Sequence, residues 1–142
     1  MNIPEPIIGT SLEWSKNMKE AGWPQDTVQH FEWHRFSLEN SVKEWYLECY
    51  FEHEDLSLES VAAPTAAEIM VQLPNIIDIE GIPYALKVAK ISTHYCVYYE
   101  TGAPDFHEKC WPIAGVMEQT LADALAGMYC LLAERNLLPS QS

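Results

Sequence analysis

Basic residues are scarce in this chain of 142 residues. Lys and Arg together number 8 against 21 Asp and Glu, which gives a formal net charge of −13 at pH 7. Proteins bind nucleic-acid backbones and anionic lipid surfaces with clusters of Lys and Arg, which displace counterions from the phosphates. The deficit argues against direct nucleic-acid binding and against binding to a membrane surface.

Long apolar runs are also lacking. No stretch of about 18 uncharged apolar residues occurs, so no transmembrane helix is predicted. The first ten residues contain no Lys or Arg and include Pro4 and Pro6, which is not the pattern of a signal peptide. With 48% apolar and 20% charged residues, the chain has the composition of one globular domain. We expect a single cytoplasmic domain over residues 1–142, with an extended segment at 1–9 and a flexible tail at 139–142.

The motifs of common enzyme classes are missing as well. The chain has six glycines, no GxSxG element, no phosphate-binding loop and no dinucleotide fingerprint. Its cysteines, Cys49, Cys96, Cys110 and Cys130, form no CxxC pair. In a cytoplasmic chain they are expected to be reduced and buried as small apolar side chains. The sequence therefore predicts no enzymatic activity, no catalytic residue and no cofactor.

Two helices are predicted from capping signals in the first half of the chain. Thr10–Glu13 has the pattern of a capping box, and Gly22 is suited to end the helix that follows. A second capping box at Thr65–Glu68 opens a short helix that Pro74 closes. Both helices are short, so each needs tertiary packing to persist.

The last helix has the strongest pattern. Thr120 can cap it, it runs to about Arg135, and Asn136 can end it in a left-handed conformation. Apolar residues repeat along it at helical spacing, with Tyr129 among those that widen the stripe. The residues at the centre of this stripe are Leu121, Leu125, Met128 and Leu132.

Strands are predicted where apolar and polar residues alternate. Residues 28–36 and 45–52 show this pattern on either side of turn residues 37–41, which predicts a hairpin, and residues 53–64 are expected to be a connection. A second hairpin is expected over residues 76–91, and a third strand over 94–100. The resulting order predicts an α+β fold with a mixed, mainly antiparallel sheet of about five strands and helices packed on one face.

The second strand of the first hairpin carries an acidic face. Residues 39–59 contain seven acids and only Lys43 as a base, a net charge of −6. Strand alternation places five of the polar residues on one side, and we name them the acidic hairpin face: Glu44, Tyr46, Glu48, Tyr50 and Glu52. Tyrosine provides contact area and carboxylates complement a basic surface, so this face predicts binding of a basic protein partner. One such partner is a host nucleic-acid-handling enzyme whose channel the face could occupy, although acidic surfaces also serve solubility alone.

The histidines raise the question of a metal site. His30 and His34 flank Glu32, but the order His-Phe-Glu-Trp-His lacks the HExxH spacing of zinc hydrolases, so these residues are expected on a half-exposed sheet face. A better candidate set is His94, Cys96, His107 and Cys110, two pairs that could complete a tetrahedral zinc site. A small zinc-stabilised or metal-dependent protein is therefore the first alternative function. A homodimeric module that pairs through the last helix or an edge strand is the second.

Three segments resemble small, mostly uncharacterised proteins encoded by bacteriophages and prophages. They are Ser15–Thr27 with its Gly-Trp-Pro-Gln turn, Ala63–Met70 followed by Leu73-Pro74, and Leu121–Ala126 with the Leu137-Leu138 ending. They cover about a third of the chain in the same order, whereas the acidic and His-rich stretches depart from that pattern. The resemblance implies a cytoplasmic phage or prophage accessory protein and brings no catalytic residues with it.

Overall fold

The computed structural model describes residues 9–25, 31–38, 41–42, 45–49, 58–101 and 114–139. Within these ranges three helices and eight strands form an α+β fold, which confirms the predicted class. In chain order they are α1 (Leu12–Glu20), β1 (Phe31–Leu38), β2 (Ser41–Val42), β3 (Tyr46–Cys49), β4 (Leu58–Ala62), α2 (Ala66–Gln72), β5 (Ile76–Ile79), β6 (Ile82–Ile91), β7 (His94–Glu100), β8 (Val116–Glu118) and α3 (Leu121–Glu134).

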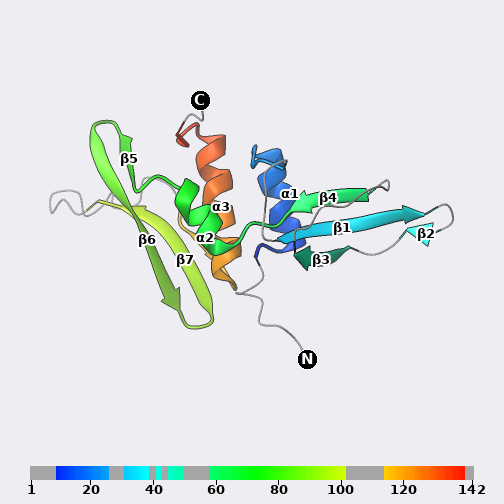
Figure 1. Ribbon diagram of the computed structural model, residues 1–142. Helices are drawn as coiled ribbons and strands as arrows, with labels where there is room; N and C mark the ends of the chain where they lie inside the picture. Colours follow the sequence, from blue (N-terminus) through cyan, green and yellow to red (C-terminus); the bar gives the residue numbers. More distant parts are fainter. Residues whose placement is uncertain are drawn as a thin grey trace.

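The strands form two antiparallel sheets of four strands each, where the sequence predicted one sheet of about five (Figure 1). In the first sheet, β1 pairs with β3 on one side and with β4 on the other, and its far end pairs with β2. The second sheet has the order β5-β6-β7-β8. The expected connection at 53–64 contains β4, and the expected turn at 37–41 contains the end of β1 and the start of β2. Strands β2, β4 and β8 are short, so their alternation is too brief to identify them.

The helices lie between the two sheets (Figure 1). Helix α3 packs against β7 and β8 of the second sheet, and α1 packs against β4 of the first. Both α1 and α2 also contact α3, so α3 is the element that links the halves of the molecule. The predicted arrangement of helices on one face of a sheet therefore applies to each sheet separately.

The core is built around the apolar stripe of α3. Leu125, Met128 and Leu132 are fully buried, together with Ile69 of α2 and Val97 of β7. The stripe predicted from helical spacing thus faces the interior. Because the chain itself covers Leu125, Met128 and Leu132, these three side chains are not available to pair with a second copy.

The start of α1 differs from the predicted capping box. Ser11 is the N-cap, and its hydroxyl accepts a hydrogen bond from the backbone N–H of Trp14. Thr10 is buried, and its hydroxyl lies 2.6 Å from that of Ser15. The Ser11 backbone N–H donates to Asp123 Oδ1 at 2.8 Å, which places a carboxylate beside the N-termini of both α1 and α3. A negative charge there is favourable for both helix dipoles.

The other two caps match the sequence prediction. Thr65 and Glu68 form the reciprocal capping box of α2, with backbone-to-side-chain distances of 2.8 and 3.2 Å. The Thr120 hydroxyl accepts from the Asp123 backbone N–H at the start of α3. Asn136 follows α3 with a φ of 58°, the predicted left-handed conformation. In the described part of the chain, no helix has the length and apolar character needed to cross a membrane.

Candidate functional site

The first hairpin forms as predicted, and its register pairs apolar positions with apolar positions. Strands β1 and β3 are antiparallel, with Trp33 opposite Leu47 and Phe31 opposite Cys49. The same register puts His34 opposite Tyr46 and Glu32 opposite Glu48. Residues that are paired across an antiparallel ladder occupy the same face of the sheet. The positions of Tyr46 and Glu48 therefore share one face, and the apolar positions share the other.

Two tryptophans connect the hairpin to α1. The Trp33 indole Nε1–H donates to the backbone oxygen of Thr10 at 3.0 Å, just before the helix. Trp45, which immediately precedes β3, has the Lys16 ammonium 5.0 Å from its ring centroid. Such a cation–π contact is favourable because the ring face carries negative charge density. These contacts fix the root of the hairpin against α1. They could not be predicted from the local pattern because their partners are far apart in the chain.

Glu32 is more buried than the sequence predicted. Its expected place was a half-exposed sheet face, but only 7% of the residue is accessible. The reason is its position on the central strand β1, between Glu48 of β3 and the buried Ala62 of β4. His34 lies on the same strand, and His30 lies outside the described residues. The alternation placed Glu32 and Trp33 on opposite faces of β1 but could not show that β3 and β4 flank Glu32 on both sides.

The acidic hairpin face is only partly described. Tyr46 and Glu48 belong to β3, and the structure gives their backbone pairing. Glu44, Tyr50 and Glu52 lie outside the described residues. Beyond the root, β1 and β2 extend away from the three helices, as Figure 1 shows. The strand that carries this face is thus part of the sheet that projects from the body of the molecule.

The metal candidates divide into a described pair and an undescribed pair. His94 and Cys96 share one face of β7, the face opposite Val97 and Tyr99 of the core. Cys96 is 3% exposed, and Nδ1 of His94 lies 3.0 Å from the Thr93 hydroxyl. His107 and Cys110 lie outside the described residues. Within the described ranges, no three His, Cys, Asp or Glu side chains come together to hold a metal ion.

The structure describes the side chains of two cysteines, Cys96 and Cys130. Cys96 and Cys130 form no disulfide; Cys96 is buried, as predicted, and Cys130 is half-buried. Burial raises the pKa of the Cys130 thiol to about 11, and the nearby charge of Glu20 contributes. Because the thiolate is the nucleophile, Cys130 reacts poorly at neutral pH. Cys49 belongs to β3 and Cys110 lies outside the described residues, so neither can be assessed in this way.

Comparisons with protein-family models, with curated proteins and with solved structures find no match to this chain.

Proposed function

We propose that this protein acts by binding a basic protein partner through its acidic hairpin face. The observation that carries the proposal is the net charge of −6 over residues 39–59, within a chain of net charge −13. The anchored root and the projecting end of the hairpin support it, because the contacts of Trp33 and Trp45 with α1 and the segment before it hold the strand in a fixed position for a partner. Complementary charge increases the association rate and selects against acidic partners.

The partner class follows from the same charge. A surface with regularly spaced carboxylates and tyrosines resembles a polyanion to a protein that binds phosphate backbones. We therefore propose a host nucleic-acid-handling enzyme as the partner, and a phage or prophage accessory protein of the cytoplasm as the biological setting. The three segments that resemble phage and prophage proteins support that setting.

Reversal of three charges on the acidic hairpin face tests the proposal. We expect the triple variant Glu44→Lys, Glu48→Lys and Glu52→Lys to weaken binding of basic proteins from a bacterial lysate about tenfold, because close opposite charges become like charges. Proteins that bind the immobilised wild type would be identified by mass spectrometry, and heparin should compete with them. The circular dichroism spectrum of the variant should match that of the wild type.

A charge-matched variant is the control for this experiment. Glu20→Lys, Asp78→Lys and Glu134→Lys change the net charge by the same amount at exposed positions outside the hairpin. Two of these positions lie at helix C-termini, where a cation is favourable. The control variant should keep its partners. Loss of the same proteins by both variants, or by neither, would contradict a specific role for the acidic hairpin face.

A further inference from the structure

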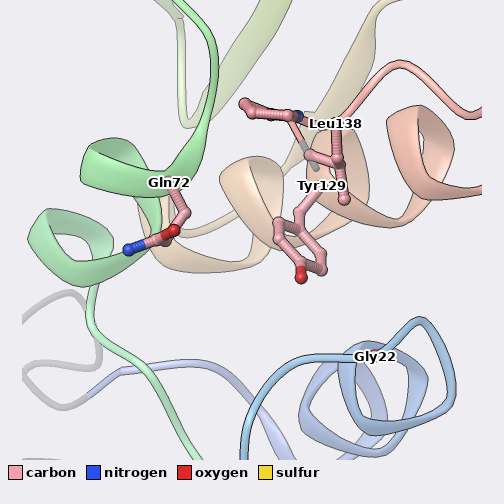
Figure 2. Close-up of a pocket in the computed structure, with 5 residues that line it drawn as sticks. Gly22, Gln72, Tyr129 and Leu138 are labelled. Atoms are coloured by element: carbon pink, nitrogen blue, oxygen red, sulfur yellow. The ribbon is translucent and has the colours of Figure 1, made fainter. Parts of the chain in front are cut away.

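A cavity of about 240 Å³ lies where the ends of the helices meet, and it opens to solvent beside the exposed residues Gly22, Gln72 and Pro139. Its walls come from four places in the chain: Gly22 after α1, Gln72 at the end of α2, Tyr129 within α3, and Leu138 with Pro139 after α3 (Figure 2). A cavity of roughly 150 Å³ is sufficient to hold benzene in a protein interior. The volume therefore suits one ring with a small substituent.

Tyr129 places a buried hydroxyl at this cavity. The residue is 4% exposed, and its ring packs edge-on against Trp23 with centroids 5.1 Å apart. Figure 2 shows the hydroxyl end of the side chain directed away from α3, toward the Gly22 turn. Among the described residues, the Tyr129 hydroxyl has no hydrogen-bond partner. Buried hydroxyls normally have one, so this donor is available to something that occupies the cavity.

Tyr99 is a tyrosine of the same core whose buried hydroxyl has a hydrogen-bond acceptor. It is fully buried, and its hydroxyl donates to the backbone oxygen of Pro74 at 2.6 Å. Burial raises the pKa of both tyrosines, and Cys130 adds a smaller contribution at Tyr129. Both hydroxyls therefore keep their protons at neutral pH. The two differ in that the core supplies an acceptor for the Tyr99 hydroxyl, whereas the Tyr129 hydroxyl has none among the described residues and its side chain lines the cavity.

The other walls determine which molecules fit. Leu138 and Pro139 offer apolar contacts, and Gly22 leaves open space because an added Cβ would meet no atom within 4 Å. The described residues that line the cavity include no Lys or Arg, so an anion would lose its hydration without a compensating charge. A cation would likewise find no carboxylate among these lining residues. The walls therefore favour an uncharged ligand.

We propose that the cavity binds an uncharged small molecule, the size of one substituted aromatic ring, whose oxygen or nitrogen acceptor takes the hydrogen bond of Tyr129. This site is separate from the acidic hairpin face and does not depend on it. The apolar ring would contact Leu138 and Pro139, and the acceptor would meet the hydroxyl.

Two probes of similar shape test this site. Acetophenone has a carbonyl acceptor, and ethylbenzene lacks one. In NMR titrations of the ¹⁵N-labelled full chain, acetophenone should shift the backbone amides of Gly22, Gln72 and Leu138 in a saturable way. A dissociation constant on the order of 1 mM is expected for a ligand of this size. Tyr129→Phe should weaken acetophenone binding about tenfold and leave ethylbenzene binding unchanged.

A second variant tests whether the probes bind in this cavity. Leu138→Trp, at a half-buried position beyond α3, should fill the cavity and abolish binding of both probes while it leaves the Tyr129 hydroxyl in place. Three results would overturn the proposal: no saturable shift in the wild type, which means a cavity that holds only water; equal acetophenone affinity in wild type and Tyr129→Phe; or probe binding that persists in Leu138→Trp.

Discussion

Leu125→Ala should lower the free energy of unfolding by about 3 kcal/mol, within the roughly 2–5 kcal/mol seen for large-to-small changes at buried leucines. Leu125 is fully buried at the centre of the α3 stripe. Truncation removes apolar contacts and leaves a cavity in the core cluster that also contains Ile69 of α2 and Val97 of β7. For a chain of this length, the change corresponds to a fall of about 10 °C in Tm. Thermal and urea unfolding followed by circular dichroism would measure it.

Two variants on the same helix or at the same position act as controls. Leu125→Met conserves volume and should cost less than about 1.5 kcal/mol. Leu131→Ala removes the same atoms at a half-buried position, so its cost should be clearly smaller. Equal losses for Leu125→Ala and Leu131→Ala would contradict the placement of the α3 stripe at the centre of the core.

The elements that the sequence predicted well are those whose signals are local. The capping box at Thr65 and Glu68 involves residues three apart, and both hydrogen bonds form as the pattern indicates. Strand β7 has the bounds that alternation predicted, His94–Glu100, and Asn136 ends α3 in the left-handed conformation. In each case the residues that decide the structure lie within a few positions of one another.

The division into two sheets depends on pairing between distant segments. Strand β4 is five residues long and is identified as a strand only by its pairing with β1, in which Val61 lies opposite Trp33. Strand β8 has three residues and is positioned by β7. At the start of α1, too, contacts outside the local pattern decide which residue is the N-cap. The Thr10 hydroxyl is hydrogen-bonded to the buried Ser15 hydroxyl, so Ser11 is the N-cap in its place.

Some features of the candidate sites were predicted from the sequence, and others were not. The faces of the first hairpin followed from alternation, since the register of β1 and β3 depends on which positions are apolar. The contact of Lys16 with Trp45 and the burial of Glu32 depend on elements that the local pattern does not contain. Tyr129 fits the apolar stripe of α3 as a packing residue. Its cavity becomes visible only when Gly22 and Leu138 are brought beside it.

Gly127 gives a prediction in which the usual effect of a substitution changes sign. It lies in the interior of α3 and is buried, where Ala would normally be favoured over Gly by about 1 kcal/mol. A Cβ at this position would lie 2.5 Å from Val116 Cγ1 and 3.3 Å from the Trp14 ring. Overpacking of this kind costs roughly 1–3 kcal/mol. After the propensity gain of about 1 kcal/mol is subtracted, we expect Gly127→Ala to lower the free energy of unfolding by up to about 2 kcal/mol in urea titrations, because β8 must shift away from α3.

A double-mutant cycle separates the clash from helix propensity. Val116→Ala removes the closest atom, so in that background Gly127→Ala should be neutral or stabilising by up to about 1 kcal/mol. Ala133→Gly, at a half-buried position of α3, gives the ordinary effect of glycine in this helix and should cost about 1 kcal/mol. If Gly127→Ala stabilised the wild-type chain, or cost the same with and without the Val116 methyl groups, α3 would not lie as close to β8 as the structure places it. The close approach matters for the whole fold, because α3 contacts both β8 and α1 and so holds the second sheet against the rest of the molecule.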